Sequence, residues 1–130
     1  MHMTNKAYDT TVLVVEDQPE ITQIIKLILK KEIYSVLMAN TAEEAIKITE
    51  AHKKNISMVI SDIILPGMNG VKLSQELQKK DPDMKFLFMS GYSDEVLEQY
   101  GNFSKNSNFI SKPFSFAHFA NMVHNILSTK

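Results

Sequence analysis

Four charged side chains in this sequence stand where apolar runs end. Asp62 closes the run Met-Val-Ile-Ser and precedes a loop that contains Pro66. Glu16 and Asp17 close the run Thr-Val-Leu-Val-Val, and Lys112 closes Phe-Ile-Ser. The ordinary role of one acidic residue after a strand is to cap a turn or helix. Three carboxylates and one ammonium, all at strand ends, favour instead one site for an anion and a metal ion.

Carboxylates that lie close together repel one another, and one of them normally stays protonated. A hard divalent cation such as Mg²⁺ removes this conflict, because it binds oxygen ligands, often one or two carboxylates with waters and a phosphate. No histidine or cysteine stands near these positions, which disfavours zinc. With its charge compensated in this way, Asp62 can act as a nucleophile toward phosphorus.

Other groups at the same strand ends can bind the oxygens of a transferring phosphoryl group. Lys112 would stabilise their charge together with the metal. Ser90 ends the run Lys-Phe-Leu-Phe-Met, and its hydroxyl can donate a hydrogen bond to these oxygens. The backbone N–H groups after Asp62 and after Ser90 can do the same. Gly91 has no side chain that would block the approach. Singly, Ser90 is typical of a turn and Lys112 of a solvated loop; together they favour one site.

Strands and helices alternate along the chain and would hold these residues. We expect strands at 11–16, 35–39, 58–62, 85–90 and 109–111. We expect helices from 17–20 to about 31, after the N-cap Thr41, at about 71–79, from 93 or 94, and after the N-cap Ser115. This alternation predicts an α/β fold, a flavodoxin-like, doubly wound five-stranded parallel sheet of order 2-1-3-4-5 with five helices. Right-handed crossovers then place the charged strand ends along one rim.

Two local patterns predict finer details. Thr41 with Glu44 three residues later is typical of a capping box, in which each residue satisfies a backbone N–H of the other. In the last helix, helical spacing predicts that four apolar side chains face inward, namely Phe116, Phe119, Val123 and Ile126.

The composition indicates one soluble globular domain. The chain has 130 residues, 44% hydrophobic and 22% charged. We interpret residues 1–8 as a disordered leader or cloning remnant and residues 9–130 as the domain. The formal charge of −1 gives no electrostatic case for binding nucleic acid or a membrane surface. No apolar run approaches the roughly 20 residues of a membrane span.

Two residue types are absent from the sequence. Without cysteine there are no disulfides, thiol nucleophiles or thiolate metal sites, which fits a reducing cytoplasm. All 14 basic residues are lysines, so this chain cannot clamp a phosphate with a guanidinium group. A bound anion must be met by lysine, backbone N–H groups, hydroxyls or a metal.

Four motifs occur in order along the chain, Val-Val-Glu16-Asp17, Ile-Ser-Asp62-Ile-Ile-Leu-Pro-Gly-Met-Asn-Gly70, Met-Ser90-Gly91-Tyr92 and Ile-Ser-Lys112-Pro113-Phe114. Through these motifs, and over residues 10–128, the chain resembles the receiver domains of two-component response regulators. The third motif, with the polar stretch 101–108, is similar to receivers of hybrid sensor histidine kinases. The chain would then be a single-domain regulator or the receiver of such a kinase.

The resemblance implies a role for each site residue. Asp62 would accept a phosphoryl group from the phosphohistidine of a histidine kinase or a histidine phosphotransfer domain. Asp17, Asp62 and the backbone carbonyl of Ile64 would bind Mg²⁺, with Mn²⁺ as an alternative, and Glu16 would act through water. Ser90, Gly91 and Lys112 would contact the phosphoryl group.

The resemblance also implies a conformational switch and a limited activity. The bond between Lys112 and Pro113 would be cis. Ser90 and Phe109 would couple phosphorylation to the face of strand 4, helix 4 and strand 5; a phenylalanine at 109 lacks the usual tyrosine hydroxyl, and a plain core role for it remains the alternative. The domain would be cytoplasmic and a monomer or a weak dimer through the helix 4, strand 5 and helix 5 face. It would at most catalyse its own phosphorylation and dephosphorylation.

Two other functions fit a similar sheet. A haloacid-dehalogenase-type phosphatase needs a second aspartate two residues after its nucleophile, and Ile64 stands there. A flavodoxin-like cofactor binder needs a phosphate-binding loop after the first strand, where Glu16 and Asp17 would repel a phosphate.

Overall fold

The computed structural model of the protein describes residues 10–52, 55–92 and 108–129. Its strands form one parallel sheet in the predicted order β2-β1-β3-β4-β5. The strands are β1 (Thr11–Val15), β2 (Ser35–Ala39), β3 (Met58–Asp62), β4 (Lys85–Ser90) and β5 (Phe109–Ser111). The helices of the described residues are α1 (Pro19–Lys31), α2 (Ala42–His52), α3 (Gly70–Lys80) and α5 (Phe116–Ser128). The predicted leader and the helix predicted from 93 or 94 lie outside the described residues.

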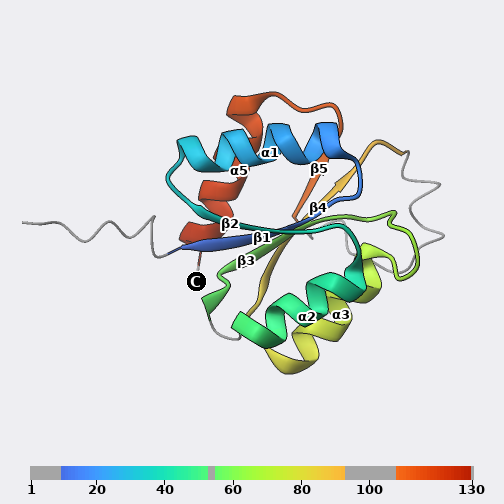
Figure 1. The fold of residues 1–130 in the computed structure, drawn as a ribbon. Coiled ribbons are helices and arrows are strands. Elements are labelled where there is room, and N and C mark those ends of the chain that lie inside the picture. Colours follow the sequence, from blue (N-terminus) through green and yellow to red (C-terminus); the bar gives the residue numbers. More distant parts are fainter. Residues whose placement is uncertain (1–9, 53–54, 93–107, 130) are drawn as a thin grey trace, which may run out of the picture.

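The helices cover both faces of the sheet (Figure 1). α1 and α5 lie on one face, over a core cluster that includes Val14 and Ile60; α2 and α3 lie on the other, over a cluster that includes Leu13 and Val59. All four of these strand side chains are 0% exposed. Both faces are buried, which is why the strand sequences read as continuous apolar runs rather than as alternating ones. No helix among the described residues has the length and apolar character to cross a lipid bilayer.

The strand register brings the functional strand ends to one edge. Val15 is paired with Ser61, Asp62 with Met89, and Ser90 with Ser111. Because the strands are parallel, the segments that leave them emerge side by side at this carboxyl edge.

Most predicted boundaries are confirmed, with small corrections at element ends. β1 ends at Val15 rather than Glu16, although the Glu16 N–H still donates to the Ala39 carbonyl at 3.0 Å. α3 begins at Gly70, where Asn69 caps it by accepting the Lys72 N–H at 2.8 Å. With this cap, the helix starts one residue before the predicted start at about residue 71.

Helix caps were predicted in part. Thr41 Oγ1 accepts the Glu44 N–H at 3.0 Å, as expected. The carboxylate of Glu44, however, accepts the N–H of Asn40 and not that of Thr41, so the reciprocal half of the capping box was wrong. Ser115 caps α5 as predicted, with its hydroxyl oxygen accepting the His118 N–H at 3.0 Å.

The predicted inward face of α5 is correct for three side chains and wrong for the fourth. Phe119 and Val123 are fully buried and Ile126 is nearly so, whereas Phe116 is 54% exposed. Phe116 is the first residue of the helix. Helical spacing gives the direction of a side chain around the axis, but not whether the sheet extends beneath that turn.

Candidate functional site

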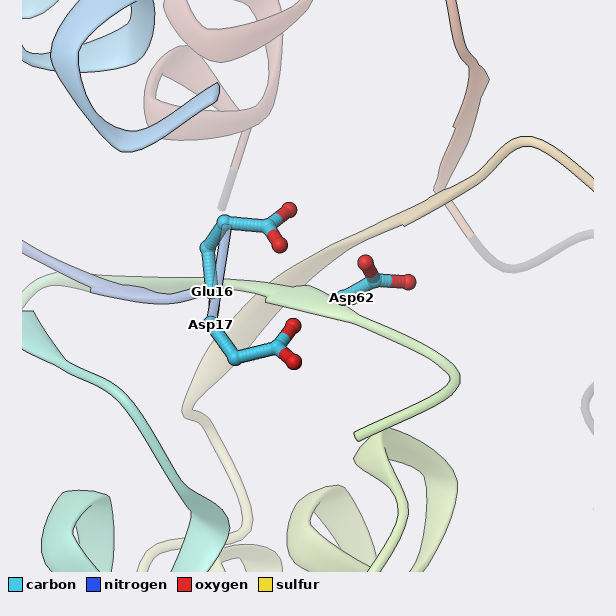
Figure 2. Close-up of side chains that lie close together, drawn as sticks. All are labelled: Glu16, Asp17 and Asp62. Carbon is cyan, nitrogen blue, oxygen red and sulfur yellow. The ribbon is translucent and has the colours of Figure 1, made fainter. Parts of the chain in front are cut away.

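Three acidic side chains meet at the carboxyl ends of β1 and β3. One carboxylate oxygen from each of Glu16, Asp17 and Asp62 lies within 4.8 Å of the others. Figure 2 shows Glu16 and Asp17 extending from the end of β1 on the side where Asp62 lies. Glu16 and Asp62 are buried and Asp17 is exposed, so the cluster is open to solvent at Asp17.

Lys112 joins two of these carboxylates. Its Nζ donates to Glu16 Oε1 and to Asp62 Oδ2, both at 2.7 Å. The side chains are 13% exposed for Lys112, 0% for Glu16 and 10% for Asp62, so little water screens the two ion pairs. One ammonium stands against three carboxylates, which leaves the cluster with a net negative charge that attracts a cation.

The pKa values of the linked pair follow from burial and hydrogen bonding. Burial raises the pKa of the Glu16 carboxyl, and the hydrogen bond from Lys112 offsets this only in part. Burial also acts to lower the pKa of Lys112, but its hydrogen bonds to Asp62 and Glu16 outweigh that effect and raise the pKa. Both directions hold together because Lys112 has two carboxylate partners, whereas the negative charge of Asp62 adds to the effect of burial and raises the pKa of Glu16 further.

Hydrogen bonds made by backbone groups hold the loop after Asp62. The Ile64 N–H donates to Asp62 Oδ1 at 3.3 Å, and the Gly70 N–H donates to the Ile63 carbonyl at 2.8 Å. The Ile63 N–H, which directly follows Asp62, donates to the Met89 carbonyl at 3.0 Å. The first N–H after Asp62 is therefore occupied by the sheet, and the second is the one that faces the carboxylate.

Ser90 is buried at the end of β4, with 1% of it exposed. Its hydroxyl oxygen accepts the Tyr92 N–H at 3.0 Å. Gly91 lies beside Lys112, because a Cβ added at Gly91 would stand 3.8 Å from the Lys112 Cβ. The structure thus brings the serine and glycine motif of β4 next to the lysine that follows β5.

Two residues expected from the resemblance lie on the β5 side of the site. The bond between Lys112 and Pro113 is cis. Phe109 pairs with Phe88 across the β4–β5 ladder, is half-buried, and packs against the core cluster beneath α2 and α3. This packing is compatible with both the switch and the core role of Phe109.

The donor set suits a hard cation. Carboxylate oxygens at mutual distances below 4.8 Å are the ligands that Mg²⁺ takes in proteins, and the described residues contribute no nitrogen or sulfur ligand to the cluster. One side of the cluster is exposed to solvent through Asp17, so water can reach it. The residues present therefore fit Mg²⁺.

The sequence did not point to Ser61 as part of this site. The side chain is 0% exposed and its hydroxyl donates to the carbonyl oxygen of Asp62 at 2.9 Å. The available signal was a single polar residue inside an otherwise apolar strand, directly before the candidate nucleophile. Ile64 is half-buried and packs against the core cluster. As an isoleucine, it supplies no acid at the position that a dehalogenase-type phosphatase requires.

Known proteins with similar sequences include a sensor kinase and a regulatory protein. The chain is 33% identical over 124 residues to the sensor kinase CckA of Brucella abortus, covering 95% of this chain and 13% of that protein. It is 33% identical over 103 residues to the regulatory protein VanR of Enterococcus faecium, covering 79% of this chain and 43% of that protein. The chain thus spans less than half the length of both relatives.

The fold gives the same result. The crystal structure of the receiver domain from the hybrid histidine kinase CckA matches with a TM-score of 0.77 and 28% identity, covering 91% of this chain and 99% of that one. In sequence, residues 12–124 match the family described as "Response regulator receiver domain". The chain belongs to this family, the receiver domains of two-component systems.

Proposed function

We propose that this domain is a phosphorylatable signalling switch in which Asp62 accepts a phosphoryl group from a phosphohistidine. The contact that carries the proposal is the 2.7 Å ion pair between Lys112 and Asp62, at the strand edge where Glu16 and Asp17 also lie. Lys112 holds the Asp62 carboxylate in one orientation and places a positive charge where the phosphoryl oxygens would come to lie.

The transfer is a displacement at phosphorus. An Asp62 oxygen attacks, the new O–P bond forms as the P–N bond to the donor imidazole breaks, and the released nitrogen takes a proton from water. Lys112 stabilises the charge on the phosphoryl oxygens. The N–H of Ile64 and the hydroxyl of Ser90 donate to the same oxygens, Ile64 because it already faces the carboxylate.

Glu16, Asp17, Asp62 and the backbone carbonyl of Ile64 would hold Mg²⁺ or Mn²⁺, with Glu16 acting through water. When bound, the ion supplies positive charge that compensates the carboxylates and the phosphoryl oxygens. Glu16 remains oriented for this role, because its Oε2 accepts the Gln18 N–H at 3.1 Å while its Oε1 accepts from Lys112.

Ser90 and Phe109 would transmit the effect of phosphorylation at Asp62 to the rest of the domain. The Ser90 hydroxyl oxygen now accepts the Tyr92 N–H, so a turn of the hydroxyl toward a phosphoryl group alters how the loop after β4 is anchored. Phe109 would respond by moving its ring within the core cluster that it already contacts.

The partner would be a histidine kinase or a histidine phosphotransfer domain in the cytoplasm. The similarity to a sensor kinase and to a regulatory protein fits either a stand-alone regulator or the receiver part of a hybrid kinase. A weak dimer through helix 4, β5 and α5 stays a prediction, because helix 4 falls outside the described residues.

The direct experiment is incubation with acetyl phosphate and Mg²⁺, followed by intact-mass measurement. The wild type should gain the mass of one phosphoryl group, and the gain should disappear when Mg²⁺ is chelated. A protein that never gains this mass from either acetyl phosphate or a phosphorylated histidine donor would overturn the proposed function.

The Asp17→Asn variant should respond less to Mg²⁺. Its exposed carboxylate lies within 4.8 Å of two others, so removing its charge relieves repulsion and removes a metal ligand. Without metal, we expect the variant to be about 0.5 kcal/mol more stable than the wild type. The stabilisation on adding Mg²⁺, measured by thermal unfolding, should be largely lost.

Asp83→Asn is the matched control for this prediction. Asp83 is exposed between α3 and β4, at the opposite edge of the sheet, so its removal should leave the Mg²⁺-dependent shift intact. An Asp17→Asn variant that shifts as much as Asp83→Asn would remove Asp17 from the ligands.

The aspartyl phosphate should be long-lived in the absence of a partner. Hydrolysis needs a water in line behind phosphorus, and the side chains two residues after Asp62 and after Ser90 are Ile64 and Tyr92. Ile64 cannot hydrogen-bond that water, and the ring of Tyr92, which is 57% exposed, is free to cover the site. Ile64→Asn should hasten phosphate loss about tenfold, whereas Ile64→Val should not.

The measurement is the loss of the phosphoryl mass with time after the phosphodonor is removed. Loss from the wild type within seconds, or equal rates for Ile64→Asn and Ile64→Val, would show that these side chains do not control the lifetime.

A further inference from the structure

The carbonyl oxygen of Asp62 is enclosed by two residues. Ser61 Oγ donates to it at 2.9 Å, and Ser61 is fully buried. Next to this hydroxyl, a Cβ added at Gly70 would stand 2.1 Å from the same carbonyl oxygen and 3.0 Å from Ser61 Oγ. The first residue of α3 thus presses directly on the backbone of the proposed phosphoacceptor, and only glycine fits there.

These contacts fix the peptide plane that follows Asp62. A peptide group is planar, so holding its carbonyl and its N–H fixes its orientation. The carbonyl end accepts from Ser61, and the N–H end, which belongs to Ile63, donates to the Met89 carbonyl at 3.0 Å. β1 has already ended here, since its last pairing with β3 joins Val15 to Ser61. The serine hydroxyl therefore donates to the plane just beyond the last pairing of that ladder.

The next peptide plane is held in the same manner. The Ile63 carbonyl accepts the Gly70 N–H at 2.8 Å, and the Ile64 N–H donates to Asp62 Oδ1 at 3.3 Å. The two planes share the Ile63 Cα, so a rotation of the first displaces the second. That displacement moves the Ile64 N–H and the Ile64 carbonyl relative to the Asp62 carboxylate.

We propose that Ser61 is a positioning residue for phosphoryl transfer, acting through the Asp62 carbonyl to fix the carboxylate and the Ile64 backbone. The inference rests on the proposed function of Asp62. Without the hydroxyl, the plane after Asp62 is held at its N–H end and by packing against Gly70. The plane then samples orientations in which the Ile64 N–H no longer faces the carboxylate, and productive encounters become rarer.

Ser74→Ala is the matched control. Ser74 is also a buried serine, 7% exposed, whose hydroxyl donates to a main-chain carbonyl, that of Val71, at 2.7 Å. It lies on α3, whereas Ser61 and Asp62 lie at the end of β3. Ser61→Ala and Ser74→Ala therefore remove the same kind of bond and should lower the midpoint of thermal unfolding to a similar extent.

The experiment measures phosphorylation by acetyl phosphate with saturating Mg²⁺, well below the unfolding midpoint of each variant. Ser61→Ala should lower the maximal rate constant about tenfold with little change in the half-saturating acetyl phosphate concentration. Ser74→Ala should keep the wild-type rate, and Ser61→Thr, which retains the hydroxyl, should recover it. If Ser61→Ala does not fold, Ser61→Cys, with its weaker donor, replaces it and should also lower the rate.

A second readout needs neither metal nor phosphodonor. Amide hydrogen exchange at Ile63 and Ile64 should be at least about threefold faster in Ser61→Ala and unchanged in Ser74→Ala. Equal rates of phosphorylation for Ser61→Ala and Ser74→Ala would overturn the positioning role. If the wild type accepts no phosphoryl group at Asp62, the proposed function fails. The exchange measurement still tests the positioning separately, because unchanged exchange at Ile63 and Ile64 in Ser61→Ala would show that the hydroxyl does not hold this backbone.

Discussion

The Asp62→Asn variant is expected to take up no phosphoryl group from acetyl phosphate or from a phosphohistidine donor. An amide is not a nucleophile toward phosphorus under these conditions, so the loss should be complete rather than partial. The side chain keeps its shape, and the Ile64 N–H can still donate to the amide oxygen, so the fold should persist. Intact-mass measurement gives the uptake and circular dichroism gives the fold.

Asp83→Asn is again a suitable control, because it removes one exposed carboxylate far from the site. It should be phosphorylated like the wild type. Uptake by a folded Asp62→Asn variant at the wild-type level would place the phosphoacceptor elsewhere.

Removal of the ammonium at the centre of the site should have the largest effect on stability. Lys112→Met leaves the buried carboxylates of Glu16 and Asp62 without their shared partner. In the absence of Mg²⁺ we expect a loss of about 3 kcal/mol in the free energy of unfolding, because the remaining charges repel one another with little solvent between them. Saturating Mg²⁺ should reduce this loss, since it supplies the missing positive charge.

Two further variants test the electrostatic cause. Lys80→Met breaks an ion pair with Glu50 in which both side chains are more than half exposed, so its effect should stay below about 1 kcal/mol. Adding Glu16→Gln to Lys112→Met should recover part of the lost stability, because one of the two unpaired charges disappears. Chemical denaturation measures both. If the double variant is less stable than Lys112→Met alone, charge repulsion is not the cause.

The sequence alone predicted most of the sheet, for reasons visible in particular strands. The bounds of β2, β3, β4 and β5 are as predicted, because each is a short apolar run between turn residues. β1 was predicted one residue too long. The Glu16 N–H still donates to the Ala39 carbonyl, but the β1–β3 ladder has already ended at Val15. Where a ladder ends depends on the neighbouring strand, which local sequence does not reveal.

The site was predictable because its residues follow strands that a parallel sheet must bring together. The sequence placed Glu16, Asp17, Asp62 and Lys112 on one rim, and the structure brings these four together. It did not indicate that Lys112 would bridge two carboxylates, because that depends on the reach and rotamer of one side chain. Nor did it indicate Ser61, whose partner is the backbone of its own neighbour.

The most direct test of Asp62 as the phosphoacceptor is to locate the phosphoryl group in the wild-type protein. Borohydride reduces an aspartyl phosphate to homoserine, which marks the residue permanently for peptide sequencing by mass spectrometry. After incubation with a phosphohistidine donor and Mg²⁺, we expect homoserine at position 62 and unmodified aspartate at position 17. Homoserine at Asp17, or a phosphoryl group that survives borohydride on a serine such as Ser90, would contradict this assignment.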